Sequence, residues 1–326
     1  MKSRIFITLV MLLTLSLGII ACQRTEPESP SLTQTPFQSQ EPTTTSDLVQ
    51  SKWQLSQPQT NSLLGIWGSS SSDVFAVGDE GTILHYDGEM WHKMESGTTL
   101  DLSGVWLTSP SDVYAVGDEG IILHYNGISW DPIKSPTTYN LKDIWGSSSS
   151  DIYIPMFSGG TLLHYNGERW IEMETGLDRP LHGVWGTSAT DVFVCGRYNA
   201  ILHYDGVSWQ VMTKGTRNMD IMIAIWGISS EDVFSGNYLG LIVHYDGKTW
   251  YTMDSGTHEN IFGFWGSSSH NVYAVGTKGT LLHYNGTGWN HLDSGTEDSI
   301  LGIWGSSANN IFAVGEDGII LHYGGE

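Results

Sequence analysis

Residues 64–98 read LGIWGSSSSDVFAVGDEGTILHYDGEMWHKMESGT, and this stretch recurs with substitutions until the chain ends. Its tryptophan returns every 39 to 41 residues, at Trp67, Trp106, Trp145, Trp185, Trp226, Trp265 and Trp304. A His-Tyr pair follows each of these tryptophans, from His85-Tyr86 in the first unit to His322-Tyr323 in the seventh. A period near forty residues indicates one supersecondary unit that stacks on its neighbours.

Each unit reads as four short strands. In the first unit they are expected at residues 64–67, 73–77, 82–86 and 91–94, where aromatic and β-branched residues dominate. Asp-Gly or Asn-Gly separates the third strand from the fourth, and these dipeptides accept the positive φ of a tight hairpin. No stretch after residue 50 has a convincing helical period. The sequence therefore predicts an all-β fold, a seven-bladed β-propeller with four antiparallel strands in each blade.

The two ends of the repeat region complete each other. The seventh unit stops at Glu326 without its fourth strand, and residues 51–55 (SKWQL) place Trp53 where the other units have their outer tryptophan. We expect this N-terminal strand to be the outer strand of the last blade, which closes the ring and removes an unpaired sheet edge. All 14 tryptophans are then accounted for, two in each blade, and the propeller spans residues 51–326.

The aligned units also resemble a known family. The run A-V-G-D-x-G-x-I-L-H-Y-[DN]-G-x-x-W, residues 76–91 in the first unit, resembles the repeats of BNR/Asp-box-like propellers. It is particularly similar to the photosystem II assembly and stability factor family. In an Asp-box hairpin one residue separates the Asp from the Gly, whereas here the two are adjacent. The resemblance implies a propeller of the kind that assists membrane-protein assembly, and it carries no catalytic motif.

The N-terminus predicts a lipid anchor. Lys2 and Arg4 precede an apolar run at residues 5–20, which is too short for an ordinary membrane span. The run ends in Ile-Ile-Ala-Cys, which resembles the lipobox of bacterial lipoproteins. The resemblance implies a signal peptide at residues 1–21, diacylglycerol on Cys22, and a lipid-anchored protein on the extracytoplasmic side of a cell-envelope membrane. A plain secretory signal with an incidental cysteine is the alternative.

Composition adds three expectations. Residues 22–50 begin with the lipidated Cys22 and continue as a segment rich in Thr, Ser, Pro and Gln, which is expected to remain an unfolded tether. Cys195 stands alone in a strand position where other units have Val, so it is expected to be a small buried residue without a disulfide partner. A formal net charge of −21 argues against a nucleic-acid partner.

The repeated histidines and aspartates are expected to be structural. Histidines that recur once in each blade form a wide ring and cannot share one ion, so neither a metal nor another cofactor is predicted. Asp73 and its counterparts, which become Asn271 and Asn310 in the last two units, are expected to close the Ser-rich loops through hydrogen bonds to the backbone.

Function is expected where the repeat is broken, because positions shared by all units serve the fold. The loop after the second strand is short and bounded by glycines in units one, two, six and seven, whereas units three, four and five replace it. Three of the four arginines of the propeller fall in the same region, and Arg beside exposed aromatics is typical of binding hot spots. The candidate partner-binding residues are Met156, Phe157, Arg179, Arg197, Tyr198, Arg217, Asn237 and Tyr238.

Three classes of function remain open. The favoured one is a non-enzymatic binding or scaffolding lipoprotein whose protein or glycan partner docks on the rim of blades three to five. The second is a sialidase-like glycoside hydrolase with three arginines for a substrate carboxylate, a tyrosine nucleophile and an acid. Its residues would be Arg179, Arg197 and Arg217, with Tyr198 or Tyr238, and with Asp178 or Asp220. The arginines are confined to one or two blades, however, so no catalytic residue is assigned. The third is a purely structural or adhesive ring.

Overall fold

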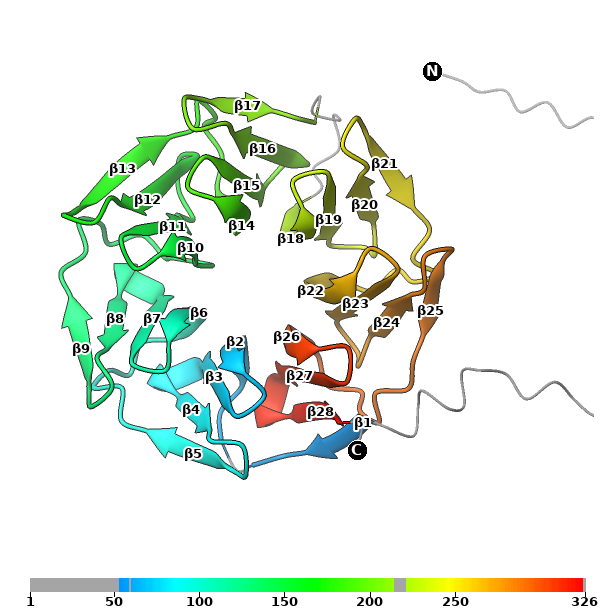
Figure 1. Cartoon of the computed structure of the whole chain (residues 1–326), viewed down its shortest axis with the longest axis horizontal. Coiled ribbons are helices and arrows are strands. Elements are labelled where there is room, and N and C mark those ends of the chain that lie inside the picture. The colour runs from blue at the N-terminus through cyan, green and yellow to red at the C-terminus, as the bar shows by residue number, and fades with distance from the viewer. Residues whose placement is uncertain (1–52, 59, 214–220, 325–326) are drawn as a thin grey trace, which may run out of the picture. The chain divides into compact units, whose positions relative to one another are not determined.

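The structure is a computed structural model that describes residues 53–58, 60–213 and 221–324. The chain divides into two units, residues 1–43 and 44–326, and all described residues belong to the second. Seven four-stranded antiparallel sheets stand side by side in a ring around a central channel (Figure 1). This is the predicted seven-bladed β-propeller.

The innermost strand of each blade faces the channel. These strands are β2 (Leu63–Ser70), β6 (Leu102–Ser109), β10 (Trp145–Ser148), β14 (Leu181–Ser188), β18 (Met222–Ser229), β22 (Ile261–Ser268) and β26 (Ile300–Ser307). The second strands are almost completely buried. They are β3 (Asp73–Gly78), β7 (Asp112–Gly117), β11 (Asp151–Pro155), β15 (Asp191–Gly196), β19 (Asp232–Asn237), β23 (Asn271–Gly276) and β27 (Asn310–Gly315).

The third strands carry the His-Tyr pairs. They are β4 (Ile83–Tyr86), β8 (Ile122–Tyr125), β12 (Thr161–Tyr165), β16 (Ala200–Tyr204), β20 (Ile242–Tyr245), β24 (Leu281–Tyr284) and β28 (Ile320–Gly324). The outer strands each begin with a tryptophan. They are β1 (Trp53–Ser56), β5 (Trp91–Met94), β9 (Trp130–Ile133), β13 (Trp170–Glu174), β17 (Trp209–Val211), β21 (Trp250–Met253) and β25 (Trp289–His291).

Blade seven is built from both ends of the propeller, as predicted. Its order is β1-β28-β27-β26, and β1 runs antiparallel to β28 with Trp53 opposite Tyr323. The Trp53 ring also packs edge-on against Tyr273 of blade six, at 6.0 Å between ring centroids. The N-terminal strand therefore closes the ring and covers the edge of β28.

The Trp-Gly pair of each unit is explained by contact between blades. A Cβ atom on Gly68 of blade one would lie 2.7 Å from the Trp304 ring of blade seven, and Gly186 of blade four meets Trp145 of blade three in the same way. The tryptophan ring of one blade thus packs against the glycine of the next, where a side chain would collide with it. Blade two departs from this rule with Leu107, which is buried in a cluster against which Trp67 packs.

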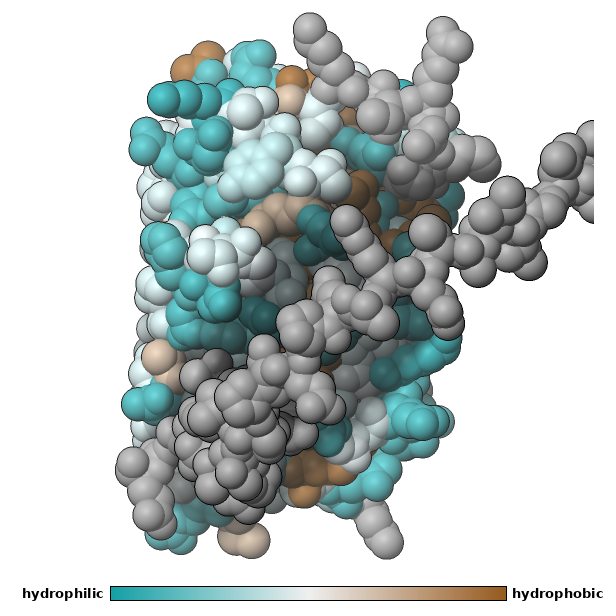
Figure 2. Space-filling model, turned by 90° about the vertical axis from the view of Figure 1, so that its right-hand side faces the viewer, coloured by the Kyte–Doolittle hydropathy of each residue, from teal (hydrophilic) through white to brown (hydrophobic). Residues whose placement is uncertain are grey.

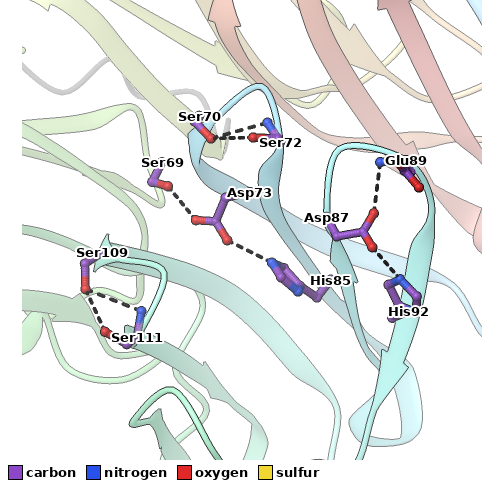
Figure 3. A network of polar contacts seen from close by, with 10 residues as sticks. All are labelled: Ser69, Ser70, Ser72, Asp73, His85, Asp87, Glu89, His92, Ser109 and Ser111. Carbon is purple, nitrogen blue, oxygen red and sulfur yellow. Dashed lines mark hydrogen bonds and ion pairs between the residues drawn. The ribbon is translucent and has the colours of Figure 1, made fainter.

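The repeated histidine and aspartate pair with each other (Figure 3). In blade one, His85 Nε2 lies 2.8 Å from Asp73 Oδ1, and the other carboxylate oxygen accepts the Ser69 hydroxyl. The His85 ring also stacks on Phe75, with centroids 4.3 Å apart. The prediction of a structural role is correct, but the partners differ from those expected: the aspartate accepts from side chains, and the Ser-rich turn is closed by the Ser72 N–H donating to the Ser70 hydroxyl.

Regular structure outside the strands is limited. Three short 3-10 turns follow the second strands of blades one, two and seven: η1 (Asp79–Gly81), η2 (Asp118–Gly120) and η3 (Glu316–Gly318). Within the described ranges, no helix has the length and apolar character to cross a membrane. On the side of the ring that carries blades five and six, hydrophilic residues surround small, separate hydrophobic patches (Figure 2).

Candidate partner-binding site

The loops that join second to third strands have one backbone design in all seven blades. The first loop residue donates its N–H to a carbonyl in the connection before the innermost strand, as Asp79 does to Ser62 at 3.0 Å and Arg197 to Pro180 at 3.1 Å. Two residues with positive φ end the loop, for example Glu80 (53°) and Gly81 (69°). Blades three to five therefore keep the turn that the sequence suggested they abandon, and blade three only inserts one extra residue, Ser158.

The side chains of these loops differ from blade to blade around the rim. In blades seven, one and two the loops present carboxylates, and we call this set the acidic sector: Asp79, Glu80, Asp101, Asp118, Glu119, Glu316 and Asp317. In blades three to five the same positions present rings, a guanidinium and an aliphatic chain. We call this set, with one adjacent arginine, the aromatic-basic sector: Phe157, Arg179, Arg197, Tyr198, Tyr238 and Leu239.

Two exposed residues of the aromatic-basic sector, Tyr198 and Leu239, are held in left-handed backbone. Tyr198 has φ 61° and a side chain 41% exposed, and Leu239 has φ 80° and is 67% exposed. Bulky residues rarely adopt this conformation, because their Cβ crowds the following carbonyl. Strain combined with exposed apolar surface gives no stability to the fold, so these two residues point to a function.

The two described arginines of this sector cover aromatic rings. The Arg179 guanidinium lies 4.8 Å from the centroid of the Tyr198 ring, and that of Arg197 lies 5.2 Å from the Phe157 ring. The rings orient both cations by cation-π attraction, which does not occupy the N–H donors in hydrogen bonds. The Arg197 Nε is buried and has no hydrogen-bond partner among the described residues.

Beside this sector the central channel opens as a cavity of about 600 Å³. Phe157 and Tyr238 from the rim loops contribute to its lining, together with the inner strands. At one repeated position the wall is polar in blades two to four and apolar in the others. The residues there are Ser103, Lys142 and His182, against Ile223, Phe262, Leu301 and Leu64.

Asp143 is a functional candidate that sequence reasoning missed. It lines the channel and stands where five blades have glycine and blade five has Ala224. Its carboxylate accepts the N–H of Ile144 at 2.8 Å and of Val184 in the next blade at 2.9 Å, while burial raises its pKa to about 7. The signal that could have found it is the single acid in a column of Gly and Ala.

His182 also lines the channel. Its ring meets Phe157 edge-on at 5.2 Å. Burial, with the positive charges of Arg197 and Lys142, lowers the pKa of His182 to about 4. The imidazole is therefore neutral at pH 7 and has one N–H to donate.

Two of the predicted candidates are not on the surface. Met156 and Asn237 are each 2% exposed, because they occupy the position of Gly78, at the end of the buried second strand. Met156 packs in a cluster that includes Leu141, and the Asn237 side-chain oxygen accepts the Leu241 N–H at 2.8 Å. The expectation that these two side chains form part of an exposed patch is corrected.

The remaining candidates divide between placed and unplaced. Phe157, Arg179, Arg197, Tyr198 and Tyr238 lie in the loops of this rim, and their role in binding stays a prediction. Arg217, Asp220 and Cys22 lie outside the described residues. Arg179 and Arg197 cover different rings, and the third arginine of the sialidase hypothesis cannot be placed. Within the described part of the chain, no group of three or more His, Cys, Asp or Glu side chains could hold a metal ion. Cys195 is fully buried, as expected, and burial raises its pKa to about 12.

Known structures share the fold at low sequence identity. A structure of YCF48 bound to D1 peptide is 15% identical, with a TM-score of 0.69 over 84% of this chain and 96% of its own. YCF48 from Cyanidioschyzon merolae is 16% identical, with a TM-score of 0.68 over 84% and 98%. The WD40 propeller domain of Doa1 is 13% identical, with a TM-score of 0.70 over 84% and 97%. These identities establish the propeller fold alone.

No protein-family model and no curated protein matches the sequence. The likeness to BNR/Asp-box repeats therefore stays a prediction.

Proposed function

We propose that this protein is a non-catalytic binding propeller, anchored to a cell-envelope membrane through Cys22, that holds a partner protein on the aromatic-basic sector. The observation that carries the proposal is the pair of exposed apolar residues in strained backbone. At the equivalent loop position, blades one, two, six and seven present Glu, Glu, Lys and Asp, while blades four and five present Tyr198 and Leu239.

Energetic reasoning favours a protein partner for this surface. Exposed Tyr and Leu lower solubility unless another surface covers them, and Tyr with Arg is the composition of binding hot spots. Arg179 and Arg197 are oriented by ring contacts, so less conformational freedom is lost when they bind a carboxylate. The acidic sector beside them repels acidic proteins from the rest of the rim.

The structural neighbours are compatible with this proposal. One of them, YCF48, is described in complex with a D1 peptide, which is a polypeptide ligand. We extend to this chain only the class of ligand, a segment of a partner protein. The resemblance to photosystem II assembly and stability factors supports the same class without naming the partner.

Membrane anchoring rests on the lipobox-like sequence that ends at Cys22. Metabolic labelling with a fatty-acid probe is expected to label the wild-type protein, while Cys22→Ser abolishes labelling and accumulates the uncleaved precursor. Labelling that persists in Cys22→Ser would exclude the anchor and leave the binding site unaffected.

Photo-crosslinking tests the binding site. A benzoylphenylalanine at position 198 in the full chain, irradiated in intact cells, is expected to give one dominant crosslinked protein, identified by mass spectrometry. The matched control carries the same group at position 80, the equivalent loop residue of blade one. Crosslinking of the same protein from position 80 but not from position 198 would place the partner on the acidic sector and refute the proposal.

A further inference from the structure

Three basic side chains surround the Phe157 ring at the mouth of the channel. Lys142 Nζ lies 5.9 Å from the ring centroid, the Arg197 guanidinium 5.2 Å, and the His182 ring centroid 5.2 Å. The whole chain has 14 Lys and Arg against 35 Asp and Glu. Basic groups are therefore scarce, and their concentration around one apolar ring requires an explanation.

Few hydrogen-bond acceptors among the described residues pair with these three basic groups. Among the described residues, Asp118 is the one carboxylate paired with any of them, at 3.3 Å from Lys142 Nζ. An ammonium has three donors, so this contact leaves Lys142 able to bind a second acceptor. The His182 Nε2 and the Arg197 Nε are both buried without a hydrogen-bond partner in the described part of the chain. A buried polar atom without a partner costs free energy, so the fold leaves the polar groups of this corner incompletely satisfied.

The wall across the channel has the opposite character. Ile223, Phe262, Leu301 and Leu64 line the cavity there, and none of them has a polar side-chain atom. The cavity volume of about 600 Å³ falls within the range of roughly 300–1,000 Å³ that is typical of small-molecule sites. The channel mouth thus combines one cationic corner with one apolar wall.

We propose that the channel mouth is a binding site for a small amphiphilic acid, with its carboxylate at Lys142, His182 and Arg197 and its alkyl chain along Ile223, Phe262 and Leu301. An alkyl chain requires only apolar contact, which this wall supplies. The carboxylate offers two oxygens, enough to accept from the lysine, the imidazole N–H and the guanidinium together.

The charge state of the corner favours an acid over the other amphiphiles. An alkylamine would bring a third cation beside Lys142 and Arg197. An alkanol would leave Arg197 without a counter-charge among the described residues, since Asp118 pairs with Lys142 alone. Asp143 lies on the same wall, but its oxygens are directed to the N–H groups of Ile144 and Val184. Burial lowers the pKa of His182 to about 4, so it donates to the ligand as a neutral ring.

Octanoate is the probe that tests the site. The full chain is reconstituted in phosphatidylcholine nanodiscs, with empty nanodiscs as the blank, and tryptophan emission is followed because Trp67, Trp145, Trp185 and Trp226 line the cavity. We expect a saturable change with octanoate, and binding at least about tenfold weaker for octylamine and octan-1-ol. A lack of saturable change with millimolar octanoate, or equal affinity for octylamine, would overturn the proposal.

Variants separate the basic corner from a general apolar channel. Lys142→Met and Arg197→Met are each expected to weaken octanoate binding about tenfold, because each removes one charge-assisted contact, while octan-1-ol binding stays unchanged. Arg169→Met serves as the control, because Arg169 is exposed in the turn between β12 and β13 and does not line the cavity. Unchanged octanoate affinity in both corner variants would overturn the assignment of the carboxylate.

A second experiment on the wild-type chain distinguishes an alkyl acid from a peptide C-terminus as the source of the carboxylate. It does not depend on the folding of any variant. Acetyl-Leu-Phe carries a carboxylate on a peptide terminus, and we expect it to bind more weakly than octanoate because its amide groups would face the apolar wall. Tighter binding of the dipeptide would overturn the alkyl-acid assignment. It would indicate that the three basic residues bind a peptide carboxylate of the partner protein.

Discussion

The acidic sector and the aromatic-basic sector are built on one backbone and present opposite chemistry. Asp79 and Arg197 donate the same loop hydrogen bond, and Glu80 and Tyr198 share the left-handed conformation that follows it. Because blades one and four share this hydrogen bond and this backbone conformation, the main difference between their loops lies in the side chains. A propeller thus keeps its rim geometry while each blade changes what the rim presents.

The acidic sector also has an electrostatic cost. The pKa of Asp79 is raised, first by partial burial and then by the neighbouring carboxylates of Asp101, Glu80 and Asp118. Like charges this close destabilise one another, so the sector does not stabilise the fold. Its effect is to repel anionic molecules from one half of the rim, which leaves the aromatic-basic sector and the channel mouth as the place where an acidic ligand can approach.

Blade seven contains the closing strand β1 and also carries part of the acidic sector. A substitution in β1 tests ring closure without changing the rim loops. Trp53→Ala removes the ring that packs on Tyr323 and Tyr273, and we expect it to lower the free energy of unfolding by about 3 kcal/mol. Gln54→Ala, at the exposed neighbour on β1, is the control and should change it by less than about 0.5 kcal/mol. Denaturant unfolding measures both. Equal stability of the two variants would contradict the closing role of β1.

The aromatic-basic sector should respond in binding and not in stability. Arg197→Glu together with Tyr198→Glu converts blade four to the chemistry of blade one, and we expect partner affinity to fall by about 2–3 kcal/mol. The melting temperature should stay close to that of the wild type, because Tyr198 is exposed and Arg197 is only partly buried, with no ion pair among the described residues. Biolayer interferometry against the crosslinked partner measures the affinity.

The reverse change provides the matched control for that prediction. Asp79→Arg with Glu80→Tyr gives blade one the chemistry of blade four, at loop positions with the same backbone. We expect no loss of partner affinity. If this control loses the partner while the blade-four variant keeps it, the functional assignments of the two sectors are reversed.

The sequence predicted what depends on the repeat. The seven blades, the hairpins and the closing role of Trp53 all follow from spacing, because the same contact is made in each unit. The prediction that Met156 and Asn237 are exposed is wrong. An alignment of the units places both at the position of Gly78, which faces the interior. Their departure from the glycine of the other units suggested surface residues, but their position at the end of a buried strand makes them buried.

Other features required the ring itself. The single acid at position 143 is visible in an alignment of the units, but its contact with Val184 of the next blade and its place on the channel exist only once the ring has formed. The cluster of Lys142, His182 and Arg197 around Phe157 joins two blades, with His182 on the inner strand β14 and the other residues in loops. No spacing rule brings such residues together.

The two sides of the ring also differ inside the channel. Blade three has Asp143 at the position where blades one and two have Gly65 and Gly104, and the titration of this carboxylate can be tested. Burial raises the pKa of Asp143 in the folded chain to about 7, above the ordinary value of about 3.9 for an aspartate in an unfolded chain, so the folded chain holds the proton more tightly. Between these two values stability is expected to fall as pH rises, by roughly 1.4 kcal/mol for each pH unit. Asp143→Asn should remove this slope, and Asp178→Asn, at an exposed site, should keep it.

Denaturant unfolding at several pH values between 4 and 8 measures these slopes. Asn can accept only one of the two N–H groups that Asp143 accepts, so we expect Asp143→Asn to have an additional loss of about 1 kcal/mol that does not vary with pH. Parallel pH profiles for wild type and Asp143→Asn would show that this carboxylate does not titrate in that range.

The smallest expected effect separates backbone strain from binding. Leu239 and Glu119 occupy the same left-handed loop position, with φ 80° and 54°, and each donates its N–H to an asparagine side-chain oxygen, on Asn260 and Asn140 respectively. Asn tolerates this conformation better than either residue, so Leu239→Asn and Glu119→Asn should each raise stability by about 0.5 kcal/mol. Only Leu239→Asn should weaken partner capture, because it alone removes exposed apolar surface from the aromatic-basic sector. Thermal melts and interferometry on the two variants measure these effects. A lower melting temperature for Leu239→Asn would show that Leu239 supports the fold, and an equal loss of capture in both variants would show that the two sectors act as one surface.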